Sequence, residues 1–128
     1  MSDALEGTAA VAIDLGTTRV KAVAIDARGD ALANLAFEAP EQHGEGRVRE
    51  SDPNAWLGLA RDALARLDPR DDRPLAFSTQ RSSFLIWRAS DGRAVTPLIS
   101  WQDRRAGDWC DAHRALEPRF RELTGLVL

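Results

Sequence analysis

A short polar segment, Asp14 to Thr18, separates two runs rich in Val, Ile and Ala near the start of the chain. Gly16 lets the backbone approach a ligand closely, and the hydroxyls of Thr17 and Thr18 can donate hydrogen bonds to phosphate oxygens. The Asp14 carboxylate can hold Mg²⁺, most often through the water molecules of that ion. The residue types therefore indicate a turn that binds phosphate groups and a metal ion.

The same residues also suit an ordinary hairpin with a polar turn. Neither of the two common glycine-rich phosphate loops is present, since the chain contains no Gly-x-x-x-x-Gly-Lys-Ser/Thr and no Gly-x-Gly-x-x-Gly. A phosphate site here would depend on backbone N–H groups and hydroxyls that converge at a turn. On these residues alone, the phosphate turn and the plain hairpin both remain open.

Three strands are predicted around this turn. Residues 10–15 and 20–26 are short, apolar and rich in β-branched side chains, and the segment 26–30, Asp-Ala-Arg-Gly-Asp, is typical of a turn. Residues 31–37 alternate between two sets of side chains, as a strand does. The simplest interpretation is three consecutive antiparallel strands.

A polar, glycine-containing loop leads to a predicted helix over residues 51–67. Ser51 or Asp52 can cap its free N–H groups, and Pro53 suits its first turn. Six apolar residues recur at helical spacing and should face the core: Trp56, Leu59, Ala60, Ala63, Leu64 and Leu67.

The second half of the chain predicts strands over residues 75–80, 83–87 and 94–101, the last with Pro97 at an edge or bulge. A helix is expected from about Asp103, with Pro118 near its end and one apolar face formed by Ala106, Trp109, Cys110 and Leu116. We expect Trp87 and Trp109 in the core and Cys110 buried. The element order β-β-β-α-β-β-β-α predicts a mixed sheet with helices packed on it.

Composition excludes several classes of protein. With 128 residues, 44% hydrophobic and 29% charged, the chain suits one folded domain. A net charge of -3 argues against nucleic acid as a partner, and the single cysteine excludes an internal disulfide. His43 and His113 have no cysteine or carboxylate at the spacing of a zinc site.

No apolar run approaches the roughly 20 residues of a membrane span, and the first residues do not resemble a signal peptide, so we expect a cytoplasmic protein.

The segment AIDLGTTRVKAVAID resembles the first phosphate motif of the sugar kinase, Hsp70 and actin superfamily. Three further segments resemble glycerol kinases and other FGGY-family carbohydrate kinases, in the order of that family: GRVRESDPNAW, STQRSSFLIWRASDGRAVTPLISWQDRRA and LTGLVL. The resemblance implies an α/β ribonuclease-H-like fold, a mixed β-sheet with flanking helices that forms an incomplete N-terminal domain. Residues 1–9 would be a tail, and residues 10–128 the N-terminal part of the first kinase domain.

The resemblance also implies ATP and Mg²⁺ as cofactors. It places Asp14, Gly16, Thr17 and Thr18 on the phosphates and the metal ion, with Asp14 as the metal-binding residue. Arg19 would reach the nucleotide, and Lys21 matches a basic position of glycerol kinases, although a strand residue that faces solvent is an equal alternative for it. These roles follow from the resemblance and are expectations.

The acceptor side of the site is expected at Gln80, Arg81 and Ser82, at the end of a strand, where α/β sheets commonly bind ligands. The position of Arg81 matches an arginine that glycerol kinases present to substrate hydroxyls, and a guanidinium has five donors in a fixed fork. Glycerol kinases follow this arginine with glutamate, and xylulokinases have Gln-Met-His here, so Ser82 departs from both. The acceptor therefore stays open among ketoses, polyols and compounds of similar size.

The segment SWQDRR would supply the second part of the acceptor site. Trp101 can form an apolar wall against the carbon skeleton of a sugar, and Gln102 and Asp103 can bind its hydroxyls. An acidic residue directly before a helix is more commonly an N-cap, and Asp103 can have both roles.

The resemblance implies a kinase that transfers the γ-phosphoryl group of ATP to a sugar or polyol hydroxyl. The catalytic base and the adenosine site of the family lie in segments after those matched here, so we expect the isolated chain to be inactive. The remainder of the kinase or a second copy of the chain would be its protein partner. Two alternatives are a non-enzymatic remnant that binds a carbohydrate or a protein, and an Hsp70- or actin-like ATPase, which shares the hairpin but not SWQDRR.

Overall fold

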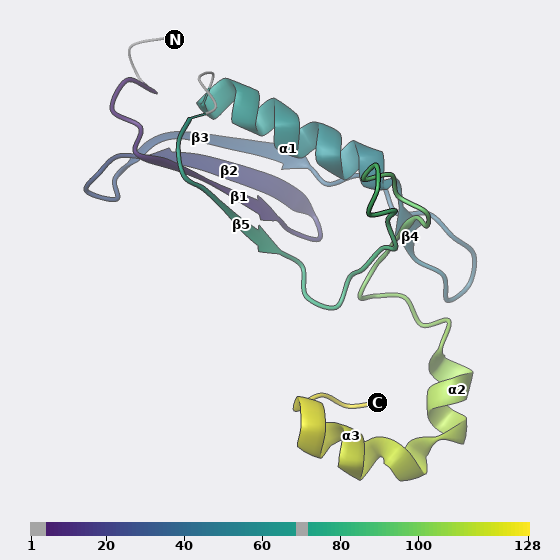
Figure 1. Ribbon diagram of the computed structural model, residues 1–128. Coiled ribbons are helices and arrows are strands. Elements are labelled where there is room, and N and C mark those ends of the chain that lie inside the picture. Colours follow the sequence, from purple (N-terminus) through teal and green to yellow (C-terminus); the bar gives the residue numbers. More distant parts are fainter. Residues whose placement is uncertain (1–4, 69–71) are drawn as a thin grey trace.

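The computed structural model describes residues 5–68 and 72–128, and its main feature is a four-stranded sheet (Figure 1). Strands β1 (Ala10–Leu15), β2 (Arg19–Ile25) and β3 (Ala31–Glu38) pair antiparallel in sequence order. The three predicted antiparallel strands are therefore confirmed.

Strand β5 (Leu75–Thr79) joins the sheet beside β1 and runs parallel to it, so the strand order is β3-β2-β1-β5. The sheet is mixed, as predicted. This arrangement brings the end of β5 next to the β1–β2 turn, because Leu15 at the end of β1 pairs with Thr79.

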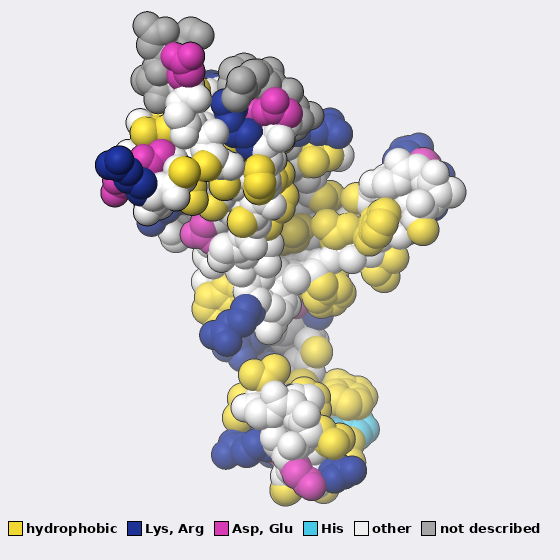
Figure 2. Space-filling view, turned by 60° about the vertical axis from the view of Figure 1, so that its left-hand side comes forward, with side chains coloured by type: hydrophobic (Ala, Val, Ile, Leu, Met, Phe, Trp, Pro, Cys, Tyr) yellow, Lys and Arg dark blue, Asp and Glu magenta, His cyan; other side chains and the backbone are white. Residues whose placement is uncertain are grey.

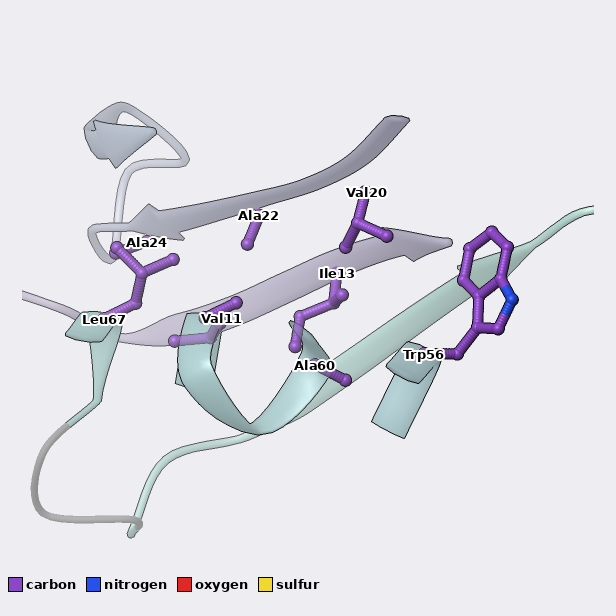
Figure 3. Packing of buried hydrophobic residues seen from close by; sticks show 9 residues of the cluster. Val11, Ile13, Val20, Ala22, Ala24, Trp56, Ala60 and Leu67 are labelled. Carbon is purple, nitrogen blue, oxygen red and sulfur yellow. The ribbon is translucent and has the colours of Figure 1, made fainter. Parts of the chain in front are cut away.

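Helix α1 (Pro53–Leu67) covers one face of the sheet and forms the core with it (Figures 1 and 3). Asp52 caps this helix, as its side chain accepts a hydrogen bond of 2.9 Å from the Asn54 N–H. The core consists of alternate residues of β1 and β2 and one stripe of α1: Val11, Ile13, Val20, Ala22, Ala24, Trp56, Ala60, Ala63 and Leu67. Trp56 lies in the core as predicted, and its indole N–H donates to the Ser51 hydroxyl at 2.9 Å.

A buried ion pair connects the end of α1 to the start of β5. The Arg73 guanidinium donates to the Asp68 carboxylate at 2.5 Å, and the two side chains are only 7% and 1% exposed. The Arg73 backbone N–H donates to the same carboxylate at 3.1 Å. The polar segment expected to end the helix includes residues 69–71, which lie outside the described residues.

The predicted strands over residues 83–87 and 94–101 are wrong in their extent. The two segments do face each other, but they pair only at the bridges Phe84–Ile99 and Trp87–Ala94. Between these bridges the Ile86 N–H donates to the Thr96 hydroxyl, which interrupts a backbone ladder. The only regular strand here is β6 (Leu98–Ile99), which pairs with the short, unpredicted β4 (Glu50–Ser51).

The predicted helix from Asp103 is also wrong in its start and its continuity. Helix α2 (Gly107–Ala112) begins later, a 3-10 turn follows, and α3 (Glu117–Thr124) is a separate helix. Pro118 lies in the first turn of α3, where its missing N–H costs no hydrogen bond, and not near the C-terminal end of a helix.

The expected apolar face of this C-terminal segment does not join the core. Neither α2 nor α3 buries any residue, and Figure 2 shows hydrophobic side chains on the surface of the lower lobe that they form. Trp109 is 54% exposed and stacks on the His113 ring, and Trp87 is 59% exposed. The prediction of both tryptophans in the core is therefore wrong, and Cys110 is only partly buried.

The face of the sheet opposite α1 carries no helix among the described residues (Figure 1). It forms a hollow of 530 Å³, whose lining includes Ala12, Asp14, Lys21 and Val23, which alternate with the core residues of β1 and β2. At the start of the chain, Thr8 is buried and the Ala9 N–H donates to the Ile25 carbonyl, so the end of the predicted tail lies against the sheet. No helix in the described part of the chain is long and apolar enough to cross a membrane.

Candidate functional site

The β1–β2 turn is closed by its own backbone. The Gly16 N–H donates to the Arg19 carbonyl at 3.1 Å, and a Cβ atom on Gly16 would lie 2.9 Å from that oxygen. Such a contact is too short for any side chain, so the hairpin itself requires glycine at this position. The adjacent Thr17 is partly buried and Thr18 is exposed, which leaves the Thr18 hydroxyl open to solvent.

The charged residues of this hairpin lie in two places. Asp14 is exposed on the helix-free face, directly across from Lys21 on β2 and beside Ser78 on β5. Arg19 forms an exposed cross-strand ion pair with Glu38 at 3.5 Å. The predicted phosphate residues are thus close in the fold, but they do not share one cavity. Asp14 and Lys21 line the hollow of the helix-free face, whereas Thr17 lines a second hollow.

That second hollow, which we name the Thr17–Trp101 cavity, has a volume of 710 Å³. It combines five residues predicted for the site with three that were not predicted: Thr17, Gln80, Arg81, Ser82 and Trp101, then Arg104, Thr124 and Leu126. The Trp101 indole N–H donates to the Thr17 hydroxyl at 3.0 Å, a contact between residues 84 positions apart. This hydrogen bond joins the predicted phosphate turn to the predicted acceptor segment.

The segment Gln80–Ser82 is held at the end of β5, where the Gln80 N–H donates to the Leu15 carbonyl at 3.2 Å. The Gln80 side-chain oxygen is buried and has no hydrogen-bond partner among the described residues. Ser82 has a φ of 64°, the only positive value for a non-glycine residue in the described ranges. Unsatisfied buried groups and strained backbone are both common at binding sites, so these features support this segment as part of one.

Asp103 lies outside the cavity lining and holds the surrounding loops together. Its carboxylate accepts hydrogen bonds from the Arg49 N–H at 2.7 Å, from the Arg105 N–H at 2.9 Å, and from two nitrogens of the Arg105 guanidinium. The Arg105 guanidinium in turn reaches Glu50 at 2.5 Å. The expected N-cap role is wrong, because α2 starts after Ala106 without a side-chain cap.

This network changes the pKa of both partners. The side-chain hydrogen bonds from Arg105 hold the pKa of the Asp103 carboxyl well below its usual range, although burial of that carboxyl acts in the opposite direction. The Asp103 and Glu50 carboxylates raise the pKa of the Arg105 guanidinium further above neutrality. Both groups are therefore charged at all physiological pH values.

Arg104 is the charged one of the three lining residues that the sequence analysis missed. It lies between Asp103 and Arg105, and its side chain lines the Thr17–Trp101 cavity. Two consecutive arginines after Trp-Gln-Asp were visible in the sequence, but no local rule says which of them faces a cavity. Gln102, the other polar residue proposed for this segment, is not among the lining residues.

The carboxylate and hydroxyl oxygens of the hairpin suit a Mg²⁺ ion that keeps most of its water ligands. No cluster of three or more His, Cys, Asp or Glu residues suited to a metal ion occurs in the described ranges, so a site made by protein alone is not supported. Asp14 is an exposed carboxylate beside Ser78 on the adjacent strand. Mg²⁺ usually keeps several waters and uses one or two carboxylates together with substrate phosphates, which this set can provide.

The fold places the chain in a known class. The chain superimposes on a xyloylose kinase from Brucella ovis with a TM-score of 0.75 and 27% identity, over 91% of this chain and 26% of that one. A Plasmodium falciparum glycerol kinase with ADP has the same fold, with a TM-score of 0.71 at 19% identity. The chain therefore has part of the ribonuclease-H-like fold found in sugar kinases, actin and Hsp70, as the sequence predicted.

Sequence comparison identifies the family. The model of the N-terminal domain of the FGGY family of carbohydrate kinases matches residues 9–128, so the chain belongs to that family. It is 42% identical to an apulose kinase of Pectobacterium atrosepticum over 80% of this chain, and 35% identical to a glycerol kinase of Thermus brockianus over 92%. The chain spans only 21% and 26% of the length of these two relatives.

Proposed function

We propose that this chain is the N-terminal part of a cytoplasmic kinase that transfers the γ-phosphoryl group of ATP to a hydroxyl of a sugar or polyol. The observation that carries the proposal is the hydrogen bond between Thr17 and Trp101, inside a cavity that Arg81 also lines. It brings a residue of the predicted phosphate turn within contact distance of the predicted acceptor segment, which is the proximity that phosphoryl transfer between two bound substrates needs.

Each part of this site has a separate task in the proposed reaction. The hydroxyls of Thr17 and Thr18 and the backbone N–H groups beside them would donate to phosphate oxygens, and Asp14 would orient water molecules on the metal ion. Bound Mg²⁺ would neutralise negative charge on the phosphates. Arg81 would donate to acceptor hydroxyls, and the buried Gln80 oxygen would accept from one of them. Trp101 would pack against the carbon skeleton of the acceptor.

We also propose that the 128-residue chain alone binds these substrates only weakly and without turnover. The residues that line the Thr17–Trp101 cavity include no carboxylate that could take the proton of the acceptor hydroxyl. The base would come from other kinase segments, in the same chain or in a partner, or from a second copy of this chain.

Calorimetric titration tests the proposal directly. The folded chain is titrated with ATP-Mg²⁺ and with glycerol, xylitol and D-xylulose, for the wild type and for Thr18→Val. We choose Thr18 because it is exposed, whereas the Thr17 hydroxyl is already bound to Trp101. Loss of one hydrogen bond to a charged group should weaken ATP-Mg²⁺ binding about tenfold and leave acceptor binding within about twofold.

Thr79→Val is the matched control, since Thr79 is an exposed threonine at the end of β5 and lies outside the Thr17–Trp101 cavity. It should leave both affinities unchanged. Equal weakening of nucleotide and acceptor in Thr18→Val would indicate damage to the fold and not a phosphate contact. A folded wild-type chain that binds neither ATP-Mg²⁺ nor any acceptor would contradict the proposal.

A further inference from the structure

The hydrogen bond between Trp101 and Thr17 has only one possible direction. An indole N–H can donate but not accept, so the Thr17 hydroxyl oxygen is the acceptor in this contact of 3.0 Å. A hydroxyl has one hydrogen and two lone pairs, and the bond from Trp101 occupies one lone pair. The hydrogen of the Thr17 hydroxyl is therefore left over, and within the described residues no group accepts a hydrogen bond from it.

Both partners of this bond lie on backbone that is held in place. The Trp101 backbone N–H donates to the Ser83 hydroxyl at 3.0 Å, and the preceding residue, Ser100, is only 4% exposed. On the other side, the Gly16 N–H closes the tight turn that carries Thr17. The indole therefore meets the hydroxyl from a defined direction, which restricts where the remaining O–H hydrogen can point.

We infer that Trp101 is a positioning residue for the nucleotide: its indole N–H holds the Thr17 hydroxyl so that the O–H points at a phosphate oxygen. The inference rests on the proposed function and gives Trp101 a second task beside its contact with the acceptor. A donor that is already oriented loses no rotational freedom when the ligand arrives, which strengthens binding. No Asp or Glu lines the Thr17–Trp101 cavity, so no carboxylate there competes with a phosphate oxygen for this hydrogen.

Trp101→Phe tests the inference, because phenylalanine keeps an aromatic ring but has no N–H to donate. ATP-Mg²⁺ is titrated into the folded chain, and its affinity is followed by the backbone signals of the β1–β2 turn in a proton–nitrogen correlation spectrum. We expect Trp101→Phe to weaken ATP-Mg²⁺ binding about fivefold, which corresponds to one neutral hydrogen bond. Trp109→Phe changes a similarly exposed tryptophan outside the cavity lining and should leave this affinity unchanged.

A double-mutant cycle separates the orientation of Thr17 from a general effect on the fold. In a Thr17→Val background there is no hydroxyl to orient, so Trp101→Phe should weaken ATP-Mg²⁺ binding no further. In a Thr18→Val background the effect should persist, because Thr18 is exposed and the indole N–H is bonded to Thr17. Any loss of xylitol or D-xylulose binding in Trp101→Phe should be equal in both backgrounds, since a wall against the acceptor needs neither hydroxyl.

The hydrogen bond itself can be followed without any ligand. The indole N–H signal of Trp101 should shift in Thr17→Val, and this hydrogen should exchange faster with water because it has lost its acceptor. Thr18→Val should leave both the shift and the exchange rate of the indole N–H unchanged. An indole signal that responds equally to the two substitutions would contradict the bond to Thr17, and with it the inference.

The binding results can also overturn the inference. Unchanged ATP-Mg²⁺ affinity in Trp101→Phe would contradict it and leave the kinase proposal intact. The same loss with and without the Thr17 hydroxyl would contradict it as well, because Trp101 would then act on the nucleotide by another route. A folded wild-type chain that binds an acceptor but no ATP-Mg²⁺ would refute this inference alone, whereas one that binds neither would also refute the proposed function.

Discussion

At the scale of single residues, Trp101 and Asp103 lie two positions apart and have different roles. Trp101 points its indole N–H at Thr17 and lines the cavity, while Asp103 accepts hydrogen bonds from Arg49 and Arg105 outside it. Asp103 thereby positions the loops that carry Trp101 and Arg104. Both oxygens of Asp103 are engaged in these protein contacts. A substrate contact of Asp103 stays a prediction.

The network around Asp103 predicts a pH-dependent stability. Because its folded-state pKa lies below the ordinary value of 3.8, the folded chain holds the Asp103 proton less tightly than the unfolded chain does. The stabilisation is therefore complete above about pH 4 and is lost as the pH falls toward the lower, folded-state pKa. In urea unfolding, Asp103→Asn should lower the midpoint at pH 7, and its difference from wild type should shrink at pH 3.

Asp111→Asn provides the comparison for this prediction. Asp111 forms an ion pair with Arg114 in which both side chains are more than half exposed, so its loss should leave the urea midpoint at pH 7 nearly unchanged. A difference between wild type and Asp103→Asn that stays constant from pH 7 to pH 3 would show that charge on Asp103 does not stabilise the fold.

At the scale of elements, the fold depends on α1 and on the way its end is joined to β5. The Asp68–Arg73 pair is almost fully buried and connects these two elements. A buried ion pair adds little compared with an apolar pair, but removal of one partner leaves a charge without compensation. The junction between helix and edge strand is therefore sensitive to single changes.

Asp68→Asn keeps the shape of the side chain and removes its charge, which leaves the Arg73 cation buried without a carboxylate at this contact. We expect the free energy of unfolding to fall by about 3 kcal/mol, measured by urea denaturation at pH 7. Asp62→Asn breaks a half-exposed pair with Arg66 on the same helix and should cost at most about 0.5 kcal/mol. Equal effects of the two substitutions would show that burial of the Asp68 pair is not important.

At the scale of the whole molecule, the sheet is open on one face and along the outer edge of β5. All five residues of β5 are exposed, including Leu75 and Phe77, and α1 is the only helix over the sheet in the described part of the chain. An unpaired edge strand with apolar side chains is a site at which chains associate. The isolated chain should therefore associate with itself or with other kinase segments.

We predict that Phe77→Lys reduces self-association, because a charge on an edge strand opposes pairing with a second edge. Sedimentation velocity over a range of concentrations should show a lower weight-average mass than for wild type, with a stability change within about 1 kcal/mol, since Phe77 is 56% exposed. Phe84→Lys changes a phenylalanine of similar exposure away from the sheet. An equal reduction by Phe84→Lys, or none by Phe77→Lys, would exclude the β5 edge as the contact.

The sequence by itself determined the features that depend on neighbouring residues. Short apolar runs predicted β1, β2 and β5, and alternation predicted β3. The Ser51 or Asp52 cap and the apolar stripe predicted α1, and four ordered motifs predicted the family. These patterns are local, because strand alternation, helix capping and motif spacing each act within a few residues of the chain.

Only the tertiary structure decided which distant side chains meet and which apolar residues are covered. It brought Thr17 to Trp101 across 84 positions, placed Arg104 in the cavity while its neighbour Arg105 binds Asp103, and left Trp87 and Trp109 exposed. A side chain is buried only if another element packs over it, and an arginine faces a cavity only if the loops around it are fixed. Both depend on contacts between segments far apart in the chain, which no local pattern encodes.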